Sequence, residues 1–232
     1  MKPRMTGLIF ALTTALPMAV TAGGGTVVKL DGSAVIERRG TKVQVAEATP
    51  LYSGDILNVA DQGLAQLHFE DDSIFVIPGA ARLKVDAFTM PAPKSGGKAV
   101  YTLLDGGLRT ITGKVSKGGK DQYELRTEEA TVTVKGSAYM ALRCQGSCAK
   151  KYKAGLYVKG EHGVMTVTNA AGQLKIKRGQ TGYIASKTTL GTHVKISPFN
   201  DPSIAAEYRI EAEFDAEVHP PRIEQDPPAS PS

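Results

Sequence analysis

Apolar and polar residues alternate along most of this chain in short runs that glycine, aspartate and proline separate. The stretch 27–85 holds several such runs and shows no helical spacing of its apolar positions. In residues 64–70, Ala65, Leu67 and Phe69 fall on one face of a predicted strand, which places His68 on the solvent side. The pattern predicts an all-β fold, a roll or sandwich of short antiparallel strands.

The same alternation gives the other strands an inner face. The predicted core residues are Val43, Val45, Phe75, Tyr123, Leu125, Ala130, Val132, Val134, Met140, Leu142, Leu156, Val158, Met165, Val167, Leu174 and Ile176. Lys175 and Lys177 then face solvent. Turns are predicted at 31–32, 39–40, 71–72, 118–119, 159–160 and 171–172, with a surface loop over 90–98. Similar stretches begin at Gly32 and Gly163, which fits either an internal repeat or two ordinary hairpins.

The N-terminal 22 residues have the pattern of an export signal. Lys2 and Arg4 precede an apolar run over 8–20, and small residues at Val20 and Ala22 suit cleavage before Gly23. An uncleaved membrane anchor is the alternative, but the run is shorter than the roughly 20 apolar residues that a span needs. The sequence thus predicts a periplasmic or secreted protein whose mature chain has no transmembrane span.

The composition changes after Pro198. Asp201 and Pro202 form a helix-start signal, so we expect a short acidic helix within 199–218, following one β domain over 23–198. Its partly apolar side would carry Ile204, Tyr208, Ile210 and Phe214. The proline-rich end, 219–232, is predicted to be disordered.

Charge divides the chain in the same place. From Phe199 onward eight acidic residues oppose two arginines, a net charge of −6. The whole chain carries +5, so without Lys2 and Arg4 the residues 23–198 carry about +9. A basic domain favours an anionic neighbour, either an acidic envelope protein or an anionic cell-envelope polymer. Nucleic acid is excluded as a partner because the chain has no Trp and no basic stripe interleaved with stacking aromatics.

Cys144 and Cys148 are the only cysteines, and a three-residue turn separates them. In an oxidising compartment a structural disulfide is favoured. A redox-active or intermolecular thiol pair and a metal site remain alternatives, although no second Cys or His pair stands at ligand spacing for a metal.

No arrangement in the sequence indicates catalysis, a metal or a cofactor. Ser33 and Ser137 follow turn glycines but lack the nucleophile-elbow pattern. The histidines are at unrelated spacings, His68, His162, His193 and His219. Asp71 and Asp72 are adjacent, so in a strand their carboxylates would face opposite ways, and we interpret them as a hairpin tip. We therefore expect no enzyme activity.

Three basic clusters are the candidate contact surface: Arg38 and Arg39, then Lys150, Lys151 and Lys153, then Lys175, Lys177 and Arg178. The alternative is that they are solvated faces and turns that keep sheet edges from aggregating.

Several motifs in order resemble the periplasmic FecR domain, a bacterial signalling and interaction module. They are the hairpin VVKLDGSAVIERRG, the turn YSGDIL, the pair AQLHFEDDSIFVIP, the segment GGLRTITGK, the pair TEEATVTVKGSAYMAL, and GLYVKGEHGVMTVTN with a closing RGQTGYI. The resemblance covers residues 26–187 and implies a β fold that binds partners without chemistry of its own.

Two departures from the FecR pattern affect what it implies. Asp72 and Lys135 stand where the family usually has glycine and arginine, and loss of the glycine disfavours a left-handed turn at Asp72. A cleavable signal also replaces the cytoplasmic segment and membrane span of FecR regulators, which puts direct control of a sigma factor in doubt. We expect an exported binding or signalling accessory; the alternative is a cell-wall or surface structural protein that contacts anionic polymers.

Overall fold

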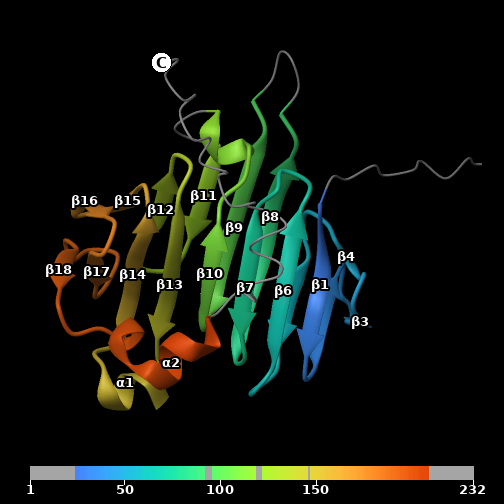
Figure 1. The fold of residues 1–232 in the computed structure, drawn as a ribbon, viewed down its shortest axis with the longest axis horizontal. Coiled ribbons are helices and arrows are strands. Elements are labelled where there is room, and N and C mark those ends of the chain that lie inside the picture. The colour runs from blue at the N-terminus through green and yellow to red at the C-terminus, as the bar shows by residue number, and fades with distance from the viewer. Residues whose placement is uncertain (1–23, 92–95, 119–121, 146, 209–232) are drawn as a thin grey trace, which may run out of the picture.

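The computed structural model describes residues 24–91, 96–118, 122–145 and 147–208 (Figure 1). They form two nine-stranded sheets that face each other as a sandwich. Sheet A runs in the order β4 (Pro50–Leu51), β1 (Gly25–Asp31), β6 (Leu64–Phe69), β7 (Ile74–Pro78), β10 (Gly107–Ile111), β13 (Ala138–Cys144), β14 (Gly155–His162), β17 (Thr181–Ile184) and β18 (Thr192–Val194). Sheet B runs in the order β3 (Thr41–Gln44), β2 (Ala34–Arg38), β5 (Ile56–Val59), β8 (Ala81–Thr89), β9 (Lys98–Asp105), β11 (Tyr123–Arg126), β12 (Thr131–Val134), β15 (Val164–Asn169) and β16 (Gly172–Lys177). The all-β prediction is confirmed.

Within the described residues, short helices interrupt the strands at four places. These are η1 (Val115–Lys117), α1 (Ser147–Lys151), η2 (Pro198–Asn200) and α2 (Pro202–Glu207). Within the described ranges, no helix is long and apolar enough to cross a membrane.

The order of strands in both sheets follows the order of the sequence, except at one edge, where β4 lies outside β1 and β3 lies outside β2. The chain crosses between the sheets repeatedly and advances along the sandwich, from the blue strands at one end to the orange strands at the other (Figure 1). Neighbouring strands pair antiparallel except β9 and β11, which pair parallel. A parallel pair cannot be joined by a tight turn, and here β10 in the opposite sheet lies between them in the chain.

The main core lies between the sheets and consists of the side chains that alternation places inward. Phe69, Phe75 and Val132 all belong to it and are fully buried. A row of aromatic rings runs through it, with centroids 5.3 Å apart for Phe69 and Phe75 and 4.8 Å apart for Phe75 and Tyr101. Tyr101 continues to Tyr123 at 6.0 Å. The predicted strand register is therefore correct through the middle of the sandwich, and Lys175 is exposed as expected.

Met140 and Leu142 are buried, but outside the core that alternation predicted for them. They belong to a second apolar cluster on the outer face of sheet A. Their neighbours Tyr139 and Ala141 are the residues of β13 that enter the main core. The prediction assigned the wrong face because β13 is apolar on both sides. The alternation of apolar and polar residues therefore does not show which side faces the main core.

The turn at 71–72 keeps its left-handed geometry without glycine. Asp72 has a φ of 66°, a conformation that Asp tolerates better than most residues. Asp71 stabilises the turn from inside, because its carboxylate accepts the backbone N–H of Ser73 at 3.1 Å and that of Val115 at 3.2 Å. Asp71 is buried whereas the Asp72 side chain is 51% exposed. The hairpin interpretation is confirmed, and the expected change of local geometry is wrong.

Other turn predictions have mixed outcomes. Arg39 and Gly40 form the two-residue turn between β2 and β3, both with positive φ. The predicted turn at Lys159 and Gly160 is wrong: both residues lie inside β14, and the chain turns at Gly163, which has a φ of 74°. A glycine inside a strand resembles a turn signal when only the sequence is read.

Several expectations fall wholly or partly outside the described residues. These are the export signal over 1–22, part of the loop over 90–98, Gly119 and the C-terminal segment beyond Tyr208. The two similar stretches both form hairpins, β2–β3 and β15–β16, at opposite ends of sheet B. In both cases the next strand of the chain lies in sheet A, β4 after the first hairpin and β17 after the second. The stretches differ afterwards, because β5 returns to sheet B whereas β18 stays in sheet A.

Candidate functional site

A helical cap covers the outer face of sheet A at β13 and β14. It consists of α1, η2 and α2, and its buried apolar cluster contains Met140, Leu142, Cys144, Tyr157, Phe199 and Tyr208. Phe199 and Tyr208 pack edge to face, with ring centroids 5.7 Å apart. Tyr208 is 2% exposed in this cluster and therefore attaches α2 to sheet A by apolar burial.

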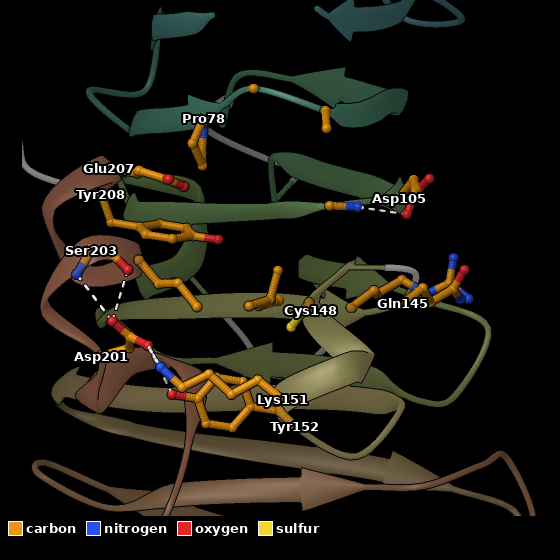
Figure 2. A pocket seen from close by; sticks show the side chains of 16 residues that line it. Pro78, Asp105, Gln145, Cys148, Lys151, Tyr152, Asp201, Ser203, Glu207 and Tyr208 are labelled. Carbon is orange, nitrogen blue, oxygen red and sulfur yellow. Dashed lines mark hydrogen bonds and ion pairs between the residues drawn. The ribbon is translucent and has the colours of Figure 1, made fainter. Parts of the chain in front are cut away.

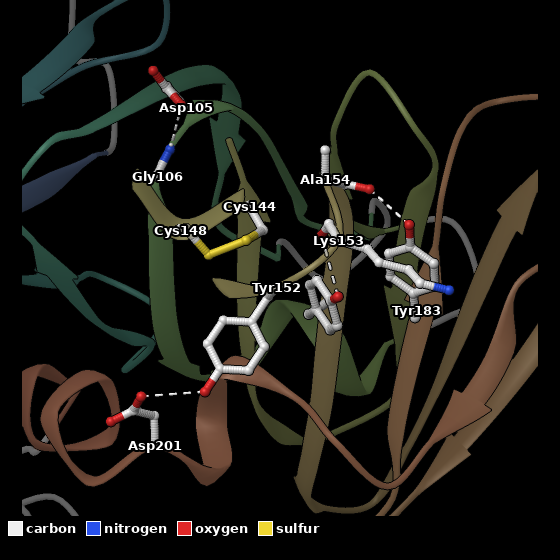
Figure 3. The surroundings of a disulfide bond; sticks show 10 residues. Asp105, Gly106, Cys144, Cys148, Tyr152, Lys153, Ala154, Tyr183 and Asp201 are labelled. Atoms are coloured by element: carbon white, nitrogen blue, oxygen red, sulfur yellow. Dashed lines mark hydrogen bonds between the residues drawn. A yellow bond between two sulfur atoms is a disulfide. The ribbon is translucent and has the colours of Figure 1, made fainter. Parts of the chain in front are cut away.

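The disulfide fixes one side of the cap. Cys144 at the end of β13 is bonded to Cys148 in α1, and the two Cα atoms are 5.2 Å apart (Figure 3). Cys144 is fully buried, so the bond is an internal brace for α1. Among the described residues, no group of three or more His, Cys, Asp or Glu side chains is placed to hold a metal ion.

Asp201 joins the two halves of the cap (Figure 2). Its carboxylate accepts hydrogen bonds from Lys151 Nζ in α1 and from the hydroxyl of Tyr152 at 3.2 Å. It also accepts the hydroxyl of Ser203 at 2.7 Å and caps the start of α2, as predicted for this position. The Lys151 ammonium and then the Ser203 bonds hold the pKa of Asp201 well below its ordinary value.

A cleft of about 670 Å³ opens beside the cap (Figure 2). Its lining includes Pro78, Asp105, Gln145, Lys151, Glu207 and Tyr208. Burial raises the pKa of Glu207.

A buried ion pair ties the two sheets together next to the cap. Arg143 points inward from β13, and its Nε atom lies 3.0 Å from Oε2 of Glu129 in the turn between β11 and β12. Its other nitrogens donate to Glu128 at 2.7 Å and to the carbonyl oxygen of Leu104. The Arg143 and Glu129 side chains are 6% and 8% exposed, whereas Glu128 is 78% exposed.

The outer face of sheet B is open and grooved over β11, β12, β15 and β16. Four threonines form its centre, with Thr133 opposite Thr166 and Thr131 opposite Thr168 in the register. Charged and amide side chains flank them: Glu124 next to Thr133, Lys175 next to Thr166, Arg126 next to Thr131 and Gln173 next to Thr168. The groove has a volume of about 910 Å³. We call this surface the threonine face.

Sequence reasoning did not identify the threonine face. The signal was present, since Thr-Val-Thr occurs at 131–133 and again at 166–168. Nothing in the sequence shows that these two triplets pair in the folded sheet.

The structure does not bring the predicted basic clusters into one surface. Arg39 is exposed at the β2–β3 turn, and Lys175, Lys177 and Arg178 are exposed on or beside β16, near the opposite edge of the same sheet. Seven strand spacings separate β2 from β16, about 34 Å. Lys150 and Lys151 belong to α1, and Lys153 follows it. All three therefore lie in or next to the cap, on sheet A and not on sheet B.

Arg38 makes a local ion pair. Its guanidinium donates to the carboxylate of Asp55 at 2.7 and 2.9 Å and to the carbonyl oxygen of Pro50 at 2.8 Å. It also stacks 4.6 Å from the ring centroid of Tyr52. The hydrogen bond to Asp55, opposed by burial, leaves a net raised pKa for Arg38. Most of its donors are therefore engaged within the chain.

The serines and histidines considered for chemistry are scattered. Ser33 is exposed, and Ser137 is buried with its carbonyl oxygen bonded to Thr112 at 2.9 Å. His162 and His193 are exposed on different strands, and His219 lies outside the described residues. His68 is partly exposed on β6, with Nε2 4.0 Å from an Asp72 oxygen.

Comparisons with known proteins give a partial likeness. No protein-family model matches the chain, and no curated protein matches it. Two crystal structures described as a putative anti-sigma factor from Parabacteroides distasonis ATCC 8503, at 1.65 and 2.50 Å resolution, are 13% identical to it, with TM-scores of 0.43 and 0.42. Each match covers 60% of this chain and 57% of the other. The chain thus matches little more than half of the length of either structure.

Proposed function

We propose that this chain is an exported, non-enzymatic binding protein of the bacterial envelope, an accessory to signalling whose protein partner docks on the threonine face. The observation that carries the proposal is the geometry of that face. Each of its inner strands, β12 and β15, is hydrogen-bonded on both sides, so the side chains of Thr131, Thr133, Thr166 and Thr168 stand on a rigid surface. A surface fixed before binding loses little entropy when a partner docks.

The charges around the threonine face favour a protein over a polyanion. Glu124, Arg126 and Lys175 bring both signs to the same groove, which suits a partner with a matching mixed pattern. A polyanion needs a continuous basic track. The cluster at Arg38 and Arg39 lies about 34 Å from the cluster on β16, and the third cluster lies at the cap on sheet A. The resemblance of the motif order to the FecR domain supports the same conclusion.

Export rests on the N-terminal pattern of residues 1–22. When the chain is produced with this segment in a bacterium, we expect periplasmic or secreted material that begins at Gly23. The intact mass of this material decides the point. A mass that retains Met1 to Ala22 contradicts cleavage there.

The docking proposal is tested by photo-crosslinking in the producing cell. A photoreactive residue at Thr133 or Thr166 should give one discrete protein adduct, whereas the same residue at exposed Gln44, at the far edge of sheet B, should not. Adding Thr131→Arg to either labelled chain should abolish the adduct, with circular dichroism confirming the fold.

The alternative function, a structural protein on anionic polymers, predicts a different result. In that case the purified chain sediments with isolated cell-wall sacculi, binding falls steeply between low and high salt, and neither threonine position gives a discrete adduct. That outcome would replace the proposal of a protein partner.

A further inference from the structure

The end of the sandwich formed by β15 to β18 is uniformly basic (Figure 1). Residues 162–200 contain no Asp and no Glu. Their lysines and arginines are Lys175, Lys177, Arg178, Lys187 and Lys195, and all five are exposed. None of the five forms an ion pair with another residue that the structure describes. An anionic group can therefore bind here without displacing a carboxylate of the chain.

Strand β16 is the outermost strand of sheet B at this end, and its hairpin with β15 determines where its backbone groups point. The turn between the two strands is two residues long, 170–171. The residues that flank such a turn exchange their backbone hydrogen bonds, and every second residue from there does the same. Leu174 and Ile176 therefore bond to β15, whereas the backbone groups of Gln173 and Lys175 point away from it.

The last residue of β16 shows the same direction. Lys177 is opposite Val164 in the register, but its backbone N–H donates to the side-chain oxygen of Gln180 at 2.9 Å. Its carbonyl oxygen accepts the backbone N–H of Gln180 at 3.0 Å. Gln173 and Lys175 share this outer side, and within the described ranges no group bonds to their backbone there. The edge thus presents unused N–H and carbonyl groups that an extended chain can pair with.

An apolar side chain is exposed at the start of this edge. Leu190 is 52% exposed, and its Cδ1 atom lies 3.1 Å from the point that a Cβ on Gly172 would occupy. Gly172 belongs to the same inner face of β16 as Ile176, which lies in the main core. The inner side chains of a strand added to β16 would contact Leu190, and its outer side chains would lie beside Lys175 and Lys177.

We propose that the partner adds an extended strand to the free edge of β16, with acidic side chains on the outer face and apolar side chains on the inner face. The proposal rests on the proposed function, because Gln173 and Lys175 also line the threonine face and an added strand extends that surface. Backbone bonds to Gln173 and Lys175 supply the affinity, and the side chains beside Lys175 and Lys177 supply the specificity.

The charge of the edge selects this occupant over two others. In a second copy of the chain, two β16 strands that pair antiparallel about Lys175 would place this lysine directly opposite its counterpart, and like charges across a strand pair are destabilising. An anionic polymer matches the charge but has no row of backbone amides to complete the ladder. An acidic strand uses both the cations and the unused backbone groups.

A peptide-binding assay on the full-length chain tests the edge directly. The probe is a fluorescent peptide in which Glu and Val alternate, and we expect it to bind saturably in low salt, whereas its Lys and Val counterpart should not bind. Gln173→Pro removes the outward N–H and should weaken binding about tenfold or more. Gln173→Thr, the matched control, keeps the N–H and should stay within about twofold. Circular dichroism confirms the fold of both variants.

N-methylated peptides give the same comparison without altering the protein. Methylation of one alternate set of the peptide's amides should abolish binding, and methylation of the other set should not, because only one set faces β16. Equal binding of the two methylated peptides would show that charge alone attracts an anionic chain, as on a polymer site, and would overturn strand addition. Absence of saturable binding by the unmethylated peptide would also overturn it.

Hydrogen exchange followed by NMR locates the bound peptide. The amides of Gln173 and Lys175 should exchange about tenfold or more slowly in its presence, whereas the amide of Leu174 is already bonded to β15 and should change little. Protection confined to other strands would contradict the proposal.

Photo-crosslinking in the producing cell separates this proposal from the proposed function. Gln173→Pro should abolish the protein adduct of a photoreactive residue at Thr166, and Gln173→Thr should preserve it. An adduct that survives Gln173→Pro would overturn strand addition and leave the threonine face as the docking site. Absence of an adduct at both Thr133 and Thr166, with peptide binding to β16 intact, would contradict the proposed function alone.

Discussion

The guanidinium of Arg143 and the carboxylate of Glu129 meet between the two sheets, with Nε and Oε2 3.0 Å apart. Both side chains are almost fully buried, although they come from different sheets. The pair also lies next to Cys144, so it joins the sandwich to the base of the cap.

Replacement of Glu129 should destabilise the fold. Glu129→Gln leaves the buried Arg143 charge without its buried carboxylate partner, and we expect a loss of roughly 3 kcal/mol in the free energy of unfolding. Glu128→Gln is the matched control, because Glu128 bonds the same guanidinium from solvent and should contribute under about 1 kcal/mol. Urea unfolding monitored by circular dichroism measures both. Equal losses would mean that the position of Glu129 between the sheets confers no extra stability.

Truncation of the aromatic row should be costly at its centre. Phe69 is fully buried and contacts three other rings, so Phe69→Ala should cost roughly 3–5 kcal/mol. Lys175→Ala, an exposed change on β16, should stay within about 0.5 kcal/mol. Thermal or urea unfolding gives both values, and similar losses for the two variants would contradict the strand register.

The attachment of α2 should depend on pH through Asp201. Its pKa is lower in the folded chain than in the unfolded chain, chiefly because of Lys151. The contribution of Asp201 to stability is therefore complete above the unfolded pKa of about 3.9 and is lost as the pH falls from there towards the folded pKa. The methyl resonances of Ile204 should shift over this acidic range. In Asp201→Asn they should stay constant over the same range, and identical pH profiles for the two proteins would show that Asp201 does not control the attachment of α2.

The disulfide should make a small contribution to stability and a large one to the local structure of the cap. Alkylation without reduction should label no cysteine, and alkylation after reduction should label Cys144 and Cys148, as intact mass will show. A bond that closes so short a loop contributes about 2 kcal/mol by chain entropy. Hydrogen exchange in α1 should nevertheless rise strongly in Cys148→Ser, because α1 has only five residues and cannot persist without its brace. Two labelled thiols in the unreduced protein would show that the bond is absent.

The sequence determined the parts of this fold that depend on local pattern. The alternation of apolar and polar residues placed Phe69 and Phe75 in the core, and the spacing of Cys144 and Cys148 indicated their bond. The same alternation assigned Met140 to the wrong core because β13 is apolar on both faces. It placed a turn at Gly160 because a glycine within a strand gives the same signal as one in a loop.

The candidate sites depended on contacts that no local pattern encodes. Thr133 and Thr166 come together only through the pairing of β12 with β15, and Arg143 finds Glu129 only across the sandwich. The basic clusters were visible as runs of charge, but their separation at opposite edges of sheet B depends on strand order. Strand order is a property of the whole chain and could not be obtained from its segments.

That strand order also determines how the molecule can be assembled and taken apart. Because the spatial order of strands follows the chain apart from β3 and β4, each strand pairs with strands at most five places away in chain order, and the interior is built up as a series of steps from β1 to β18. Such an arrangement is similar to that of repeat proteins, in which each unit contacts mainly its neighbours. Folding can therefore spread from an ordered part to the adjacent strands, and unfolding can start at an end. The cap, closed by Asp201 and the disulfide, lies over β13 and β14 in the late half of this series, so it ties residues 198–208 back to strands that precede them in the chain.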